Sequence, residues 1–168
     1  HRSAARMPNR SQPADGTTPE IETLLTELYE KSAAQKYGLQ LDEFRTILLQ
    51  IGTKYLSVEA DSAQVRELYV GLRVEELALA RACAAGNERA WEDFMVRFRE
   101  KLYDVAGFIT KEASSARELA DSLYADLYGT VGREGKRVSK LSSYTGRGSL
   151  EGWLRTVMAQ EHVNGYRR

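Results

Sequence analysis

Residues 142–168 read SSYTGRGSLEGWLRTVMAQEHVNGYRR, a glycine-rich basic loop followed by a segment with helical periodicity. Ser149 is a candidate N-cap for this helix, because its hydroxyl can accept a hydrogen bond from a backbone amide of the first turn. The apolar residues that follow recur at helical spacing: Leu150, Trp153, Leu154, Val157 and Met158. The segment therefore predicts a helix that packs one apolar stripe on a core and presents polar faces to other molecules.

Charge is distributed unevenly along the chain. The 168 residues include 24 Lys and Arg and 24 Asp and Glu, so the formal net charge is zero. Residues 133–168 contain eight basic and three acidic side chains, a net charge of +5, and the preceding residues therefore carry −5. A basic end of this kind is a candidate surface for the phosphates of a nucleic acid.

The composition predicts an all-α fold. The chain contains only three prolines, no stretch of alternating Val and Ile, and much Leu, Ala, Glu and Arg, which favours helices. The single cysteine, Cys83, excludes an intramolecular disulfide. No apolar run approaches the roughly 20 residues that span a bilayer, and no signal peptide is recognisable. We therefore expect a cytoplasmic protein without a membrane span.

The first part of the chain predicts a tail and a small helical module. Residues 1–17 are polar and are expected to be disordered. Residues 18–73 predict three amphipathic helices that begin near Thr18, Asp42 and Asp61. Because these helices cannot leave their apolar faces exposed, the module should pack on the rest of the chain or bind a regulator. Nine acidic residues against six basic ones argue against DNA binding by this module.

Residues 74–168 predict a second, compact domain of four helices. An alanine-rich helix ends at Gly86, Asn87 caps a long aromatic-rich helix, and Ser114 or Ser115 caps a third helix. The leucines of this third helix should face the core. Its opposite side should be exposed and acidic, with Glu118, Asp121, Ser122, Ala125 and Asp126.

Residues 77–168 resemble region two of bacterial RNA polymerase sigma factors of the extracytoplasmic-function (ECF) type. Four blocks carry the resemblance in order and spacing: LARACAAGN at 79–87 with AW at 90–91, the acidic helix ELADSLYADLY at 118–128, GRGSL at 146–150 with WL at 153–154, and the terminal arginine pair. The chain departs from the family at Asp121-Ser122, where a Gln-Glu pair is usual, and at Gln160, where an Asn is usual. The resemblance covers slightly more than half of the chain.

The resemblance implies a sigma factor, or its N-terminal fragment, that binds RNA polymerase core and recognises and melts the promoter −10 element in transcription initiation. It implies no chemistry of its own, no cofactor and no metal. The acidic helix, through Glu118, Asp121, Ser122, Ala125 and Asp126, would contact the clamp of the largest polymerase subunit. The single-stranded −10 DNA would contact Tyr144, Arg147, Ser149, Arg155, Gln160, Asn164, Arg167 and Arg168.

These residue types suit single-stranded DNA, because cations hold the backbone and aromatic or planar groups stack on the bases. Tyr144 lies in a polar loop and is predicted to be exposed, forming one side of a base pocket with Gln160 at its rim. Trp153 lies on the apolar stripe and should belong mainly to the core. The start of the last helix should attract a phosphate, because its first amides lack helical partners.

Two other functions stay open. A sigma-like adaptor would keep this fold and bind only protein, such as the polymerase core or an anti-sigma factor. A phosphate-handling enzyme could use the GRGS loop, but no Lys-Ser or Lys-Thr follows it, and His162 is the only histidine beyond the first residue. We therefore expect that the protein is not an enzyme. The sequence leaves open whether a region-four domain follows in the full-length protein.

Overall fold

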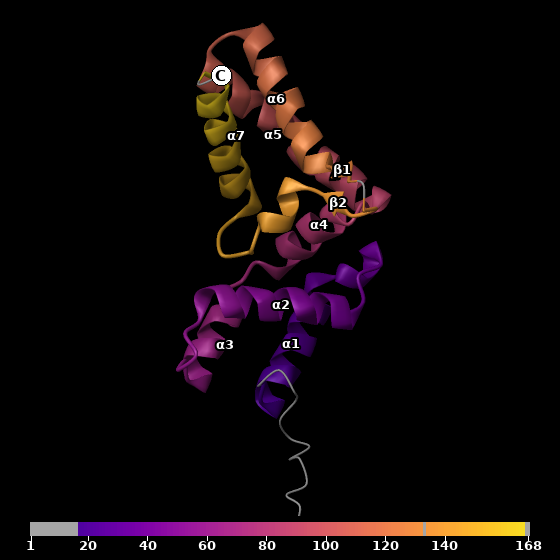
Figure 1. The fold of residues 1–168 in the computed structure, drawn as a ribbon, viewed down its shortest axis with the longest axis vertical. Coiled ribbons are helices and arrows are strands. Elements are labelled where there is room, and N and C mark those ends of the chain that lie inside the picture. Colours follow the sequence, from indigo (N-terminus) through magenta and orange to yellow (C-terminus); the bar gives the residue numbers. More distant parts are fainter. Residues whose placement is uncertain (1–16, 133, 167–168) are drawn as a thin grey trace, which may run out of the picture.

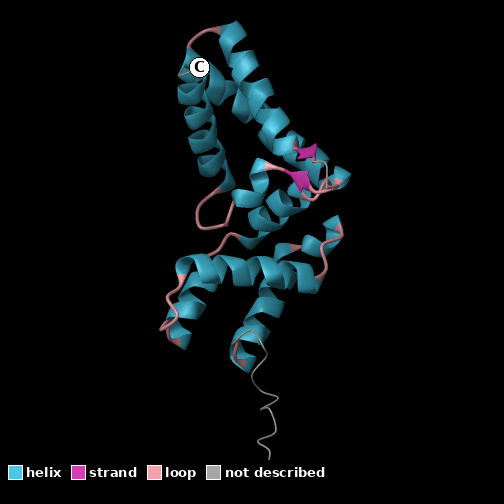
Figure 2. Cartoon of the chain, viewed as in Figure 1, coloured by secondary structure: helices cyan, strands magenta, loops and turns pink. Residues whose placement is uncertain are grey.

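The computed structural model describes residues 17–132 and 134–166, so the predictions for residues 1–16, Arg167 and Arg168 lie outside the described part. Within it the regular secondary structure is helical apart from one short antiparallel hairpin (Figures 1 and 2), which confirms the all-α prediction. The elements are α1 (Pro19–Ser32), η1 (Ala34–Tyr37), α2 (Leu41–Tyr55), α3 (Ser62–Val70), α4 (Val74–Ala84), α5 (Glu88–Thr110), α6 (Ala113–Tyr128), β1 (Thr130–Val131), β2 (Arg137–Val138), η2 (Lys140–Ser143) and α7 (Leu150–Tyr166).

Several helix starts follow directly from local sequence. The Ile21 amide donates to the Thr18 hydroxyl over 3.3 Å at the start of α1, where Pro19 occupies the first helical position. Asp61 and Gln64 form a reciprocal capping box at the start of α3, with bonds of 2.8 and 2.9 Å. Each such cap satisfies backbone donors that have no partner inside the helix.

Two of the caps predicted for the second half of the chain have different outcomes. Asn87 accepts from the Ala90 amide over 2.9 Å and starts α5 as expected. The prediction that Ser114 or Ser115 caps α6 is wrong, because α6 begins at Ala113. Both serines therefore lie within the first turn, where their hydroxyls donate to the carboxylate of Glu112.

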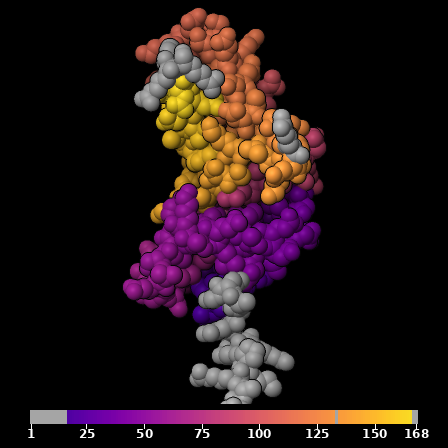
Figure 3. Space-filling model, viewed as in Figure 1, coloured from indigo at the N-terminus to yellow at the C-terminus, as the bar shows by residue number. Residues whose placement is uncertain are grey.

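One hydrophobic core runs through both halves of the chain. Its buried members extend from Leu25 of α1 through Leu77 of α4 to Met158 of α7. The helix α4 lies between the N-terminal helices and the α5–α7 group (Figure 1), and the two halves meet along a continuous contact in the space-filling view (Figure 3). Residues 18–73 thus pack on the rest of the chain, which is the first of the two predicted alternatives. Each fully buried Leu or Phe contributes roughly 1.5–3 kcal/mol relative to an exposed one.

Polar bonds reinforce this packing. The Tyr37 hydroxyl donates to the Asp93 carboxylate over 2.6 Å, and the Asn87 side-chain amide donates to the Tyr37 carbonyl over 2.8 Å. Both bonds join the N-terminal module to α5 and its cap. The module is therefore held against the second half by specific hydrogen bonds as well as by apolar contact.

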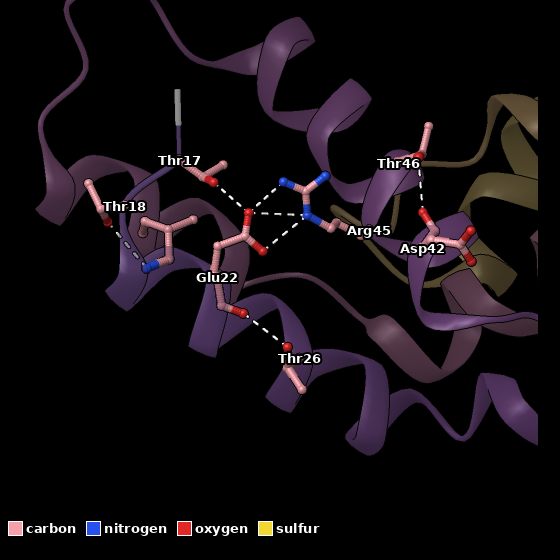
Figure 4. A network of polar contacts seen from close by, with 8 residues as sticks. Thr17, Thr18, Glu22, Thr26, Asp42, Arg45 and Thr46 are labelled. Carbon is pink, nitrogen blue, oxygen red and sulfur yellow. Dashed lines mark hydrogen bonds and ion pairs between the residues drawn. The ribbon is translucent and has the colours of Figure 1, made fainter. Parts of the chain in front are cut away.

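A charged network joins α1 to α2 (Figure 4). The Arg45 side chain donates through Nε to both carboxylate oxygens of Glu22, over 3.1 and 3.0 Å, and also through Nη2. The Thr17 hydroxyl donates to the same carboxylate. The Arg45 and Glu22 side chains are only 28% and 29% exposed, and this two-pronged contact links α1 to α2 more effectively than a single exposed ion pair would.

The long helix α5 supplies the aromatic centre of the second half. Trp91 stacks on Phe94 with ring centroids 5.2 Å apart, and Phe94 lies 5.0 Å from Phe98.

Gly129 ends α6 at φ 83°, and a Cβ there would lie 2.4 Å from the Val138 carbonyl oxygen. Only glycine fits this crossing, which brings the chain from α6 through the hairpin toward η2 and the GRGS loop.

Candidate nucleic-acid interface

Tyr144 is buried rather than exposed. Its residue surface is only 2% exposed, and its ring meets Trp153 edge-on with centroids 5.7 Å apart. Its hydroxyl donates to the Gly148 carbonyl over 2.6 Å, and burial raises the pKa of this phenol above its ordinary value. The prediction that Tyr144 is an exposed base-stacking side chain is therefore wrong. The ring packs beneath the loop, so this side chain is shielded from solvent even though its neighbours in the sequence are polar.

The start of α7 is occupied by two acceptors from the protein itself. The Ser149 hydroxyl accepts from the Gly152 amide over 3.0 Å, so Ser149 is the N-cap as predicted. The Leu150 amide donates to the Glu76 carboxylate over 3.2 Å. The expectation that these amides are free for a phosphate is thus wrong, since Glu76 already places a negative charge at the positive end of the helix dipole.

Glu76 is a structural residue that the sequence reasoning missed. It lies on α4 with 9% of its surface exposed, among apolar neighbours. Its carboxylate pairs with Arg97 at 3.4 Å and with Arg73 at 3.9 Å. The sequence does hold a clue to this role, since Glu76 lies inside an alanine-rich helix whose other positions are nearly all apolar. A carboxylate in such a place needs charged or hydrogen-bonding partners.

The GRGS loop is held against the N-terminal module. The Arg73 amide donates to the Gly146 carbonyl over 2.8 Å, and Gly146 has a φ of 79°. The Arg147 guanidinium is exposed and lies 4.4 Å from the ring centroid of Tyr55, at the end of α2. The predicted DNA-contacting residue Arg147 therefore has an aromatic neighbour from the other half of the chain, which sequence spacing could not reveal.

The polar face of α7 presents three of the predicted DNA-contacting residues to solvent. Arg155 is exposed and pairs with Glu151 one turn earlier at 3.8 Å. Gln160 donates through its side-chain amide to Asn164 over 3.2 Å, and both residues are exposed. The predicted pocket with Tyr144 on one side and Gln160 at its rim is not formed, because the Tyr144 ring points into the core.

The acidic side of α6 is exposed as predicted, and residues of α5 and α7 lie beside it. Glu118, Ser122 and Asp126 line a groove of about 640 Å³ whose other wall includes Asn164 of α7. Asp121 instead accepts a hydrogen bond from the Tyr103 hydroxyl of α5 over 2.8 Å. The predicted polymerase-contacting face and the distal half of α7 therefore border the same groove.

Glu161 is the most perturbed carboxyl group of that groove. Burial raises the pKa of Glu161 from 4.5 to about 7, and the neighbouring Asp126 carboxylate adds to the rise. The Lys140 ammonium, 3.7 Å away, opposes it. The buried Oε2 of Glu161 has no hydrogen-bond partner in the described part of the chain. A proton on Glu161 would supply a donor toward Asp126 and relieve the repulsion between the two carboxylates.

Stability should consequently fall as pH rises through the titration of Glu161. Because the folded pKa lies above the unfolded value, the contribution is fully present below about pH 4.5 and is lost as pH rises through about 7. Glu161→Gln, which keeps the shape without the charge, should be more stable than wild type at pH 8 by on the order of 1 kcal/mol. Urea unfolding from pH 5 to 8 measures this difference, and His162→Gln controls for the adjacent imidazole. A difference that is constant with pH would contradict the assignment.

Comparisons with protein-family models, with curated proteins and with solved structures find no match. Among the described residues, no helix is both long and apolar enough to cross a membrane. Within residues 17–132 and 134–166, no group of three or more His, Cys, Asp and Glu side chains is placed to hold a metal ion.

Proposed function

We propose that this chain is a sigma-type subunit of bacterial RNA polymerase, or the N-terminal fragment of one, that binds the core enzyme and captures single-stranded −10 promoter DNA. The observation that carries the proposal is the exposure of Arg147, Arg155, Gln160 and Asn164 along one loop-and-helix segment. An acidic helix borders the same segment. A cytoplasmic location follows from this function.

The DNA-contacting side combines cations with amide side chains. Arg147 and Arg155 can neutralise phosphates, while Gln160 and Asn164 can donate to and accept from the edges of unpaired bases. Arg155 is available for this role because its exposed pair with Glu151 is worth only about 0.2–0.5 kcal/mol. Binding should weaken with added salt, since each phosphate contact releases counterions.

The polymerase-contacting side is the acidic face of α6. Its leucines Leu123 and Leu127 are fully buried, so the carboxylates of Glu118 and Asp121 are presented from a fixed helix. A fixed row of like charges favours a basic partner surface and disfavours acidic ones. The clamp of the largest polymerase subunit is the partner that the sigma resemblance implies, and an anti-sigma factor could compete for the same face.

The burial of Tyr144 favours a second candidate, an adaptor that binds polymerase without reading DNA. Fluorescence anisotropy with core polymerase and two labelled oligonucleotides, a single-stranded −10 element and its scrambled form, separates the two functions. A sigma-type subunit should bind core and give the complex a preference for the −10 strand. The adaptor should bind core without any such preference. A chain that binds neither core nor DNA would contradict both functions.

Charge reversal on α6 should weaken binding to the polymerase core. Asp121→Arg is expected to raise the dissociation constant about tenfold, because like charges would then meet across the interface. Asp121→Asn keeps an acceptor for Tyr103 and should have a smaller effect. Glu100→Arg, an exposed reversal on α5, is the matched control. Competition against labelled wild-type chain measures all three variants, and equal affinity of Asp121→Arg and wild type would exclude this face from the interface.

A further inference from the structure

The end of α2 and the GRGS loop together form a site from two distant parts of the sequence. The Arg147 guanidinium lies 4.4 Å from the Tyr55 ring centroid, and the Lys54 ammonium lies 5.3 Å from the same centroid. The Tyr55 and Thr145 hydroxyls are 3.4 Å apart. Tyr55 is 37% exposed although it continues the apolar face of α2. An exposed aromatic ring is thus flanked by two cations.

The two cations are both exposed on the surface. Lys54 and Arg147 are exposed, and within the described residues neither forms an ion pair. The hydrogen bond with Thr145 lowers the pKa of Tyr55, and the nearby charges of Lys54 and Arg147 add to this effect. Two cations thus lie beside one aromatic ring, although residues 18–73 as a whole carry more acidic than basic side chains. The net charge of a module sums over its whole surface, so an acidic module can still carry a local pair of basic side chains.

A hollow adjoins this cation–aromatic cluster. It measures about 390 Å³, and its lining includes Tyr55 at the end of α2, Leu56 directly after it, Gln64 and Glu67 of α3, and Arg147. This volume lies within the range of small-ligand sites. The Gln64 side-chain oxygen is used in the capping box of α3, which leaves its amide hydrogens, while the Glu67 carboxylate can accept from the exocyclic amine of a base. The hollow thus offers both stacking and polar groups.

We propose that Lys54, Tyr55 and Arg147 bind one unpaired nucleotide, with its base against the Tyr55–Arg147 pair and its phosphate near Lys54. The inference rests on the proposed function and extends it, because it gives the N-terminal module a direct role in holding single-stranded DNA. In this proposal Tyr55 stacks on the base, the role that the sequence had predicted for Tyr144. The Thr145 contact and the Arg73–Gly146 hydrogen bond keep the loop beside α2, so the site is formed before DNA arrives.

The test uses the full chain bound to core polymerase and a fluorescent oligothymidylate of about 20 nucleotides, because stacking tolerates any base. Tyr55→Ala should weaken binding about tenfold, and Tyr55→Phe, which keeps the ring, should stay within about twofold of wild type. Lys54→Ala should reduce the slope of log affinity against log salt by about 0.7, the value for one phosphate contact on a single strand. Lys36→Ala is the matched control, because Lys36 is exposed and lies 4.8 Å from the Tyr37 ring centroid, before the opposite end of α2.

Photocrosslinking of the unmutated chain gives an independent measurement. Oligothymidylate with 5-iodouracil in place of thymine should crosslink to Tyr55, identified by mass spectrometry of the digested complex. If Tyr55→Ala binds as tightly as wild type and no crosslink forms at Tyr55, this site is wrong, while the proposed function still stands. Absence of any oligonucleotide binding by the wild-type complex would overturn both.

Discussion

Tyr144→Ala should lower the free energy of unfolding by about 3–5 kcal/mol, the cost of removing a buried aromatic ring. The ring is 2% exposed and contacts Trp153, so its loss opens a cavity between the loop and α7. The carbonyl of Gly148 also loses its donor. Chemical unfolding followed by Trp fluorescence measures the change, with circular dichroism as a second probe because Trp153 is itself adjacent.

Tyr144→Phe separates the structural role of this residue from any contact with DNA. It keeps the ring and removes only the hydroxyl, which should cost about 1 kcal/mol. Its affinity for single-stranded DNA should match wild type. A Tyr144→Ala protein that is as stable as wild type but binds DNA tenfold more weakly would contradict the core assignment and restore the stacking role.

Glu76→Ala should be the second most damaging substitution, costing about 2–3 kcal/mol. It removes the acceptor of the Leu150 amide at the start of α7 and leaves Arg97 and Arg73 without their shared carboxylate. The cost stays below that of breaking a fully buried ion pair, because the two arginine side chains are 53% and 58% exposed. Thermal and urea unfolding of the variant measure the effect.

Two neighbouring substitutions test the reason for that cost. Glu76→Gln keeps an acceptor for the Leu150 amide and loses the charge, so it should cost less, about 1 kcal/mol. Glu75→Ala changes an exposed carboxylate in the same helical turn and should cost under about 1 kcal/mol, the worth of a charge near a helix dipole. Equal losses from Glu75→Ala and Glu76→Ala would show that the contact with α7 contributes nothing.

Short-range features of this protein could be predicted from the sequence by itself. The caps at Thr18, Asp61, Asn87 and Ser149 form because each side chain bonds to an amide only three residues away. The exposed acidic face of α6 follows from leucines spaced one turn apart, since a helix that buries one face must present the other. These features depend on geometry within one or two turns, which is fixed by residue order.

Only the tertiary structure decided which residues complete the candidate site. Glu76 reaches the start of α7 across 74 positions, and Tyr55 meets Thr145 across 90. Tyr144 is buried because its ring packs on Trp153 and its hydroxyl bonds to Gly148, whereas Tyr55, the last residue of α2, is 37% exposed. Local pattern specifies which face of a helix is apolar, but burial of a particular ring depends on what else packs over it, and that is set by contacts between segments far apart in the chain.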